Sequence, residues 1–341
     1  MNITTSSQST NALVSLLEWL RESRYSFTTI APASHARVNA RRGAELARTL
    51  RDVFGWSRPF ASKLLPAAVY DCLLSARLLE ERPDGLLKSR VRVSSLAGEL
   101  FVHSAYPTTE EDAVFFGPDT YRFANLVAQE LEAEPLRAGA RILDLGCGSG
   151  AGGIVAAQLA GDARPELLLS DINARALDFA AANALHAGWR SAQLLQGDLF
   201  APVAGELDLV VANPPYLNDA AQRTYRHGGG RWGEALSLRI AREGLPRLAT
   251  GGRLVLYTGV AMADGVDPLL QAARPLLDAQ GWPWRYRELD PDVFGEELEQ
   301  PAYAEAERIA AVALVVRRPA AGEHARAQED GWGMVLHPAM A

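Results

Sequence analysis

Cysteine is scarce in this sequence, and long apolar runs are missing. The only two cysteines, Cys72 and Cys147, lie in different segments. This excludes a disulfide scaffold and gives no zinc-ligand spacing, so no metal site is predicted. No apolar run reaches the ~18 residues that a membrane-spanning helix needs, and residues 1–10 are polar, without the basic start of a signal peptide. We therefore expect a soluble, cytoplasmic protein without a membrane partner.

An overall positive charge is also missing. The chain holds 34 Lys and Arg against 41 Asp and Glu, a formal net charge of −7, so as a whole it is not a polyanion binder. The charge is uneven, because residues 1–100 hold 14 basic and 9 acidic residues while the other 241 residues hold 20 and 32. A basic front end permits a nucleic-acid or acidic-protein partner, and a solvated arginine-rich helical surface explains it as well.

The length of 341 residues, of which 48% are apolar, suits about two domains. Residues 1–110 are predicted to be mainly helical with a small hairpin. This pattern resembles a winged-helix module and equally fits an accessory domain that touches no nucleic acid. The expected helices cover 11–20, 42–54, 57–65 and 66–79, and the hairpin covers 87–102. Residues 319–341 are expected to be a loose tail.

Residues 111–318 alternate between strand and helix patterns, after a link that leads into a helix capped by Asp119 or Thr120. This alternation predicts an α/β domain with a mostly parallel sheet covered on both faces. Strands are expected at 141–145, 166–171, 192–196, 207–212, 252–258, 284–289 and 310–317, and helices at 119–131, 152–160, 174–187, 234–248 and 265–280. The last strand is expected to be antiparallel and to lie at the edge of the sheet.

The stretch 141–153 is the most informative one, because a buried strand leads through a glycine-rich turn into a helix. Glycines let the backbone approach a ligand closely, and a helix N-terminus favours polar groups. The turn alone fits two kinds of site. Gly148-x-Gly150-x-x-Gly153 matches a dinucleotide pattern, and a nucleoside site of another kind is equally compatible.

Polar residues follow three further strands at their carboxyl ends, where ligands bind in such sheets. Asp171 lies where a ribose-binding carboxylate is expected, and Asp198 could reach an adenine amino group. The third group is Asn213-Pro214-Pro215-Tyr216, directly after an apolar strand. Each has a plainer interpretation: Asp171 as a helix cap, Asp198 as a turn residue, and residues 213–216 as a rigid strand exit.

Taken in order, Asp144-x-Gly146-x-Gly148-x-Gly150, Asp171, Asp198 and Asn213-Pro-Pro-Tyr216 resemble the class I S-adenosylmethionine-dependent methyltransferases. The resemblance covers roughly residues 113–318. It argues against a dehydrogenase, because no nicotinamide-binding pattern requires Asn-Pro-Pro-Tyr after a strand. The motif at 213–216 looks like that of a branch which methylates planar nitrogens, including release-factor glutamine methyltransferases and amino-methylating enzymes of DNA and rRNA bases. A Rossmann-like fold and S-adenosyl-L-methionine as cofactor are implied.

The resemblance also implies site residues. The implied catalytic residues are Asn213, Pro214, Pro215 and Tyr216. The Asn213 oxygen and the Pro214 carbonyl would accept the N–H groups of the nitrogen, and Tyr216 would stack on the planar group. The implied cofactor-binding residues are Phe116, Thr120, Asp144, Gly146, Cys147, Gly148, Gly150, Asp171, Ile172, Asn173, Asp198, Leu199 and Asn213.

The glutamine methyltransferases share two further patterns with the chain, Phe116 with Pro118-Asp119-Thr120 and a glycine-rich stretch at 227–233. Gly117 stands where the family has arginine, and the glycine-rich stretch lacks the family's acidic residue. The predicted acceptor is a protein glutamine amide, such as one in a translation factor. The alternatives are an exocyclic amino group of an rRNA or tRNA base and a small-molecule amine. Residues 225–232 fit a substrate lid or a plain glycine loop.

Overall fold

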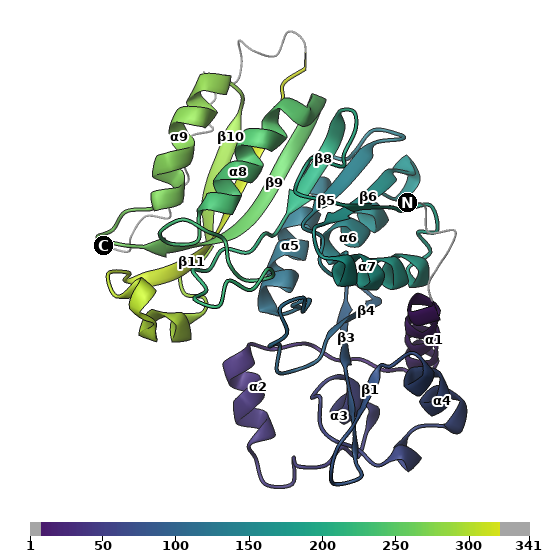
Figure 1. Ribbon diagram of the computed structural model, residues 1–341. Helices are drawn as coiled ribbons and strands as arrows, with labels where there is room; N and C mark the ends of the chain where they lie inside the picture. The colour runs from purple at the N-terminus through teal and green to yellow at the C-terminus, as the bar shows by residue number, and fades with distance from the viewer. Residues whose placement is uncertain (1–7, 321–341) are drawn as a thin grey trace.

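A seven-stranded sheet forms the centre of the computed structural model, which describes residues 8–320 (Figure 1). The strand order is β10-β11-β9-β8-β5-β6-β7. The strands are β5 (Arg141–Leu145), β6 (Glu166–Asp171), β7 (Gln193–Gln196), β8 (Leu207–Ala212), β9 (Leu248–Met262), β10 (Trp284–Asp290) and β11 (Arg308–Arg317). β11 runs in the opposite direction to the other six strands of this sheet. The predicted Rossmann-like α/β fold is confirmed.

Helices cover both faces of the sheet, because successive strand residues point to opposite sides. Ile142 of β5 belongs to the hydrophobic core on one face, and the next residue, Leu143, belongs to the core on the other. The first face carries α5 (Pro118–Ala133), α6 (Ala151–Ala160) and α7 (Ala174–His186), and the second carries α8 (Ala235–Gly244) and α9 (Pro268–Gln280). Short 3-10 turns occur at Gly161–Ala163, Leu245–Arg247, Gly295–Glu299 and Pro301–Tyr303.

The prediction that the last strand lies at the edge of the sheet is wrong, although its antiparallel direction is correct. β11 lies between β9 and β10, and β10 forms the edge. Eight consecutive residues of β11, from Ile309 to Val316, are buried. A strand covered on both faces is apolar throughout. The unbroken apolar run 309–316 is therefore the sequence signal for a central position.

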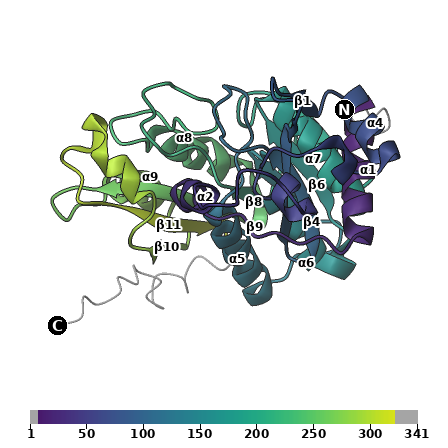
Figure 2. The same cartoon turned by 90° about the horizontal axis from the view of Figure 1, so that it is seen from below.

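The N-terminal part packs directly against the sheet domain. It consists of α1 (Gln8–Glu22), α2 (Pro32–Asn39), α3 (Leu50–Phe54), α4 (Ala67–Ser75) and two antiparallel pairs, β1 (Leu79–Glu81) with β2 (Leu87–Ser89) and β3 (Val91–Leu96) with β4 (Glu99–Ser104). α1 lies beside α7 in both views (Figures 1 and 2). Phe179 of α7 shares one hydrophobic cluster with Leu13 and Leu17 of α1.

The sequence overestimates the helices of this part. The predicted helix 42–54 is helical only in α3, because Gly43 has a φ of +86° and Thr49 caps a helix that begins at residue 50. The predicted helix 57–65 is reduced to a 3-10 turn at Ser62–Leu64, and α2 was not predicted. Of the predicted tail, residues 321–341 lie outside the described residues.

Candidate active site

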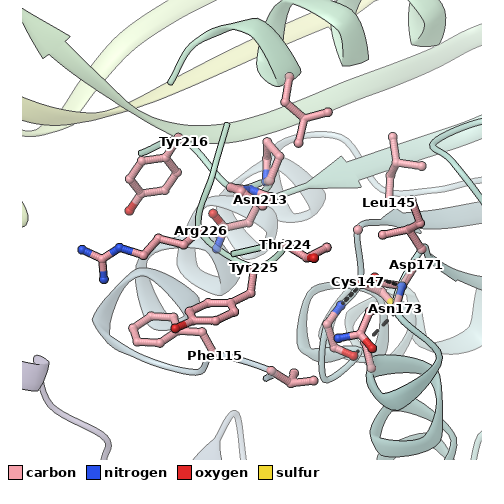
Figure 3. Close-up of a pocket in the computed structure, with 18 of the residues that line it drawn as sticks. Phe115, Leu145, Cys147, Asp171, Asn173, Asn213, Tyr216, Thr224, Tyr225 and Arg226 are labelled. Atoms are coloured by element: carbon pink, nitrogen blue, oxygen red, sulfur yellow. Dashed lines mark hydrogen bonds between the residues drawn. The ribbon is translucent and has the colours of Figure 1, made fainter. Parts of the chain in front are cut away.

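A cavity of about 370 Å³ lies at the carboxyl ends of β5, β6 and β8. Residues 145–149, 151–152 and 171–173 line one side, which we call the cradle wall. Residues 213–217 and 224–227, together with Gln222, line the other side, the exit wall. Figure 3 places Asn213 between Tyr216 on one side and Cys147 and Asp171 on the other. The turns that the sequence singled out thus meet around one cavity.

Backbone hydrogen bonds hold the cradle wall. Gly146 and Gly148 have φ angles of +66° and +52°, which side chains disfavour. The Gly148 N–H donates to the Asp171 Oδ2 at 2.9 Å, and the Gly153 N–H donates to the Asp144 Oδ2 at 2.7 Å. Burial raises the pKa of Asp144 to about 7, and it also raises the pKa of Asp171. Through these two hydrogen bonds, the Asp144 and Asp171 carboxyl groups stabilise the glycine-rich turn.

The alternative role of Asp171 as a helix cap is not what the structure shows. Asn173 caps α7, because its side-chain oxygen accepts the Arg175 N–H at 3.0 Å. Asp171 instead accepts the Asn173 N–H at 2.9 Å through Oδ1 and lines the cavity. It thus remains available to a ligand on the cradle wall.

Asp198 lines the cavity beyond β7, but an arginine already binds its carboxylate. Arg239 of α8 donates to both oxygens, at 2.9 and 2.7 Å. Leu199 follows with a φ of +45° and lines the same cavity. Asp198 can therefore contact a ligand only while it keeps its bidentate ion pair with Arg239.

Two of the predicted cofactor residues do not line the cavity. The ring of Phe116 lies in the core, stacked on His103 with ring centroids 4.8 Å apart, and Phe115 lines the cavity instead. Adjacent residues in an extended segment point to opposite sides, so Phe115 faces the cavity and Phe116 faces the core. Gly150, with a φ of +76°, starts α6 and faces Ile154 and Ala180.

The remaining predicted site residues line the cavity. They are Thr120, Asp144, Gly146, Cys147, Gly148, Asp171, Ile172, Asn173, Asp198, Leu199, Asn213, Pro214, Pro215 and Tyr216. Thr120 was also predicted, with Asp119, as a possible cap of α5. The N-cap is Gly117, whose N–H donates to the Thr120 Oγ1 at 3.3 Å. Asp119 lies buried in the first turn of α5.

The exit wall depends on contacts between distant parts of the chain. The Asn213 side chain lines the cavity and has no hydrogen bond to any other residue of the range 8–320. The Tyr225 hydroxyl donates to the Thr108 carbonyl at 2.7 Å, and Arg226 forms an ion pair with Glu297. Residues 222–227 are thereby fixed beside Asn213 (Figure 3).

The sequence missed several cavity residues. Phe115, Asp119, Tyr225 and Phe294 all line the cavity. Tyr225 belongs to the segment 225–232 that was considered as a lid, and Phe294 belongs to the acidic segment 290–297, which also fits a segment that closes over the substrate. Across residues 8–320, no group of three or more His, Cys, Asp or Glu side chains could hold a metal ion, and no helix is long and apolar enough to cross a membrane.

Comparison with known proteins agrees with this geometry. The family described as Methyltransferase small domain matches residues 109–259. A release factor glutamine methyltransferase of Bordetella pertussis is 32% identical over 216 residues, which cover 61% of this chain and 73% of that protein. One of Deinococcus radiodurans is 29% identical over 219 residues, with the same shares.

A methyltransferase structure from Pyrococcus furiosus covers 57% of this chain and 83% of its own, at 18% identity and a TM-score of 0.39, too low to carry an argument. The family assignment rests on the sequence relatives, since the match to the Bordetella protein extends over most of its length. The chain belongs to the class I S-adenosylmethionine-dependent methyltransferases, in the family of the release factor glutamine methyltransferases.

Proposed function

We propose that this methyltransferase transfers the methyl group of S-adenosyl-L-methionine to the side-chain amide nitrogen of a glutamine in a protein substrate, a translation factor. The relatives named above are release factor glutamine methyltransferases. The observation that carries the proposal is the Asn213 amide, which faces the cavity without a hydrogen-bond partner in residues 8–320 and precedes two prolines.

The cradle wall fits the nucleoside end of this cofactor. Each Asp171 oxygen accepts one backbone N–H, which leaves acceptor capacity for ribose hydroxyls. Ile172 lines the cavity with a side chain that is 55% exposed, so it can cover the face of an adenine ring. Asp198, oriented by Arg239, can accept from an adenine amino group. When bound, the cofactor supplies a methyl group on a positively charged sulfur.

The exit wall would then act on the acceptor nitrogen. An amide nitrogen is a poor nucleophile because its lone pair is shared with the carbonyl group. As it gains the methyl group its N–H groups become more positive, and acceptors aimed at them favour that state. The Asn213 oxygen and the Pro214 carbonyl would be these acceptors. The two prolines restrict φ and fix this carbonyl. The nitrogen finally loses one proton to solvent.

We further propose that residues 111–318 carry out the reaction and residues 1–110 form an accessory domain that docks the target protein, with 319–341 as a tail. The start of the family match at residue 109 supports this division. The aromatic side chain of Tyr216 would stack on the planar amide, which again fits a flat acceptor group.

A labelling experiment tests the acceptor. The enzyme is incubated with methyl-labelled cofactor and, separately, with the protein and the RNA pool of a cell extract. We expect label in the protein pool and methylated glutamine after digestion. Label in the RNA pool would overturn the protein acceptor, and label only in the small-molecule fraction would point to an amine substrate.

One surface favours the second candidate, an amino group of an RNA base. Five arginines between residues 37 and 51 are exposed, and none is paired with an acidic side chain of residues 8–320. They are Arg37, Arg41, Arg42, Arg48 and Arg51. Such a surface suits phosphate, and contacts of this kind weaken steeply with salt. Methyl transfer to an RNA acceptor should therefore fall sharply as salt is raised.

A further inference from the structure

A buried carboxylate joins the start of α5 to the exit wall. Asp119 is only 4% exposed and lines the cavity. Its Oδ2 accepts the Tyr216 hydroxyl at 2.7 Å, and its Oδ1 accepts the Tyr257 hydroxyl at 2.6 Å. Arg122 adds a longer contact of 3.2 Å to Oδ1. The sequence offered this residue as a helix cap, a role that the structure gives to Gly117, and as part of the Pro118-Asp119-Thr120 pattern.

These bonds have a fixed direction. A buried carboxylate without partners is costly, and an ionised one can only accept hydrogen bonds. Burial raises the pKa of Tyr216, so its hydroxyl stays protonated and donates. Hydrogen bonds to a charged acceptor are stronger than neutral ones. The position of the Tyr216 ring is therefore coupled to the position of Asp119.

The ring of Tyr216 is also held from two other directions. It lies directly on the backbone of Gly259 in β9, where a Cβ atom would come within 2.2 Å of the ring carbon Cε2. Phe294 approaches at a ring-centroid distance of 6.0 Å and an interplanar angle of 65°. These two contacts act on the faces and edge of the ring, and the hydroxyl bond to Asp119 is the directional contact at its tip.

We propose that Asp119 is a positioning residue, which fixes the ring of Tyr216 for the methyl acceptor. The inference rests on the proposed function only where it assigns Tyr216 a contact with the acceptor. Asp119 lies next to Thr120 in the first turn of α5, and both residues line the cavity. This one turn would therefore fix the position of the acceptor side of the cavity relative to the cofactor side.

Tyr257 offers a matched control. Its hydroxyl donates to the same carboxylate, but its ring is fully buried and does not line the cavity. Tyr257→Phe and Tyr216→Phe each remove one hydroxyl bond to Asp119, and only the second releases a residue of the exit wall. Asp119→Asn keeps the side-chain shape, and Arg122 retains its ion pair with Asp290 at 2.7 Å.

The first measurement is the rate of methyl transfer from labelled cofactor to the cell protein pool, with thermal unfolding and calorimetric affinity for S-adenosylhomocysteine in parallel. We expect Asp119→Asn and Tyr216→Phe to slow transfer at least about tenfold. Their double variant should be no slower than the single ones. Tyr257→Phe should lower the unfolding temperature comparably and keep a rate within about threefold of the wild type. Equal loss of rate in all three variants would overturn the proposal.

The second measurement needs no acceptor. Tyrosine is labelled with carbon-13 at the ring carbon that bears the hydroxyl, and the Tyr216 signal is assigned from the Tyr216→Phe variant. In Asp119→Asn this signal should shift and broaden. An unchanged signal would overturn the proposal. A changed signal with no transfer to protein in the wild type would instead count against the protein acceptor alone.

Discussion

The two walls of the cavity are built in different ways. In the cradle wall, Asp171 bonds to Gly148 and Asn173, which lie 23 and 2 residues away in the chain. In the exit wall, Tyr216 bonds to a residue 97 positions away, and Tyr225 to one 117 positions away. Bonds between the Asp171 carboxylate and backbone groups of two successive strand–turn–helix units hold the first wall. Side chains from distant segments hold the second.

This difference matches what each wall has to do. A turn that binds a constant nucleoside can be specified once by glycines and carboxylates. A wall that receives the acceptor has to suit one particular partner, and long-range side-chain contacts can change without disturbing the sheet. We therefore expect substitutions in the cradle wall to act on cofactor affinity, and substitutions in the exit wall to act on turnover.

The largest effect is expected from Asn213→Ala. The variant loses one of the two acceptors that stabilise the developing charge on the nitrogen, so turnover should fall about 10²–10³-fold. Cofactor affinity, measured by calorimetry, should stay close to that of the wild type. Asn218→Ala is the matched control, because Asn218 donates to the Arg231 carbonyl and does not line the cavity. Equal turnover in both variants would remove Asn213 from the mechanism.

The next effect tests the cradle wall. Asp171→Ala removes a half-buried carboxylate that accepts two backbone N–H groups, and it should weaken cofactor affinity by about 1–3 kcal/mol. Asp178→Ala, on the exposed side of α7, is the control and should leave the binding isotherm unchanged. If Asp171→Ala bound as tightly as the control, the carboxylate would serve only to hold the turn.

The sequence predicted the cradle wall better than the exit wall for the same physical reason. The bounds of β5, β6 and β8 match the predicted strands residue for residue, because apolar runs and turn residues are local signals. No local pattern indicates that Asp119 would meet Tyr216. The choice between Phe115 and Phe116 depends on which side of an extended segment faces the sheet, and this is settled only by tertiary packing.

The central place of β11 is an intermediate case. Its residues 309–316 form an unbroken apolar run, which predicts burial on both faces. The expectation of an edge position came from the long segment without a helical pattern that precedes the strand. Strand order does not follow chain order in a sheet with crossovers, so the composition of the strand was the better guide.

A further prediction concerns the pH dependence of stability rather than catalysis or binding. Burial raises the pKa of Asp144 from 3.8 to about 7, so the folded state binds its proton more tightly than the unfolded chain. This contribution to stability is present at low pH and is lost as the pH rises from about 4 to about 7. Asp144→Asn lacks it, while its amide oxygen can still accept the Gly153 N–H.

Chemical denaturation at several pH values measures this contribution. The difference in unfolding free energy between the wild type and Asp144→Asn should change by about 1.4 kcal/mol per pH unit in the middle of that range, to the disadvantage of the wild type at higher pH. Asp162→Asn, an exposed position, serves as the control. A difference that stays constant with pH would show that Asp144 does not hold a proton in the folded state.

The smallest effect is expected from Tyr225→Phe, and it bears most directly on the comparison of the two walls. The variant loses the 2.7 Å bond to the Thr108 carbonyl, worth about 1 kcal/mol, and a longer bond of 3.3 Å that the Tyr225 hydroxyl accepts from the Arg223 Nη1. Tyr286→Phe is the control, because it loses a similar bond, at 2.6 Å to Asp267, and neither residue lines the cavity. Both should lower the unfolding temperature slightly and leave cofactor affinity unchanged. Only Tyr225→Phe should slow transfer to the acceptor, by several-fold, because the bond fixes residues 222–227 beside Asn213. If it weakened cofactor binding instead, the two walls would not be functionally separate.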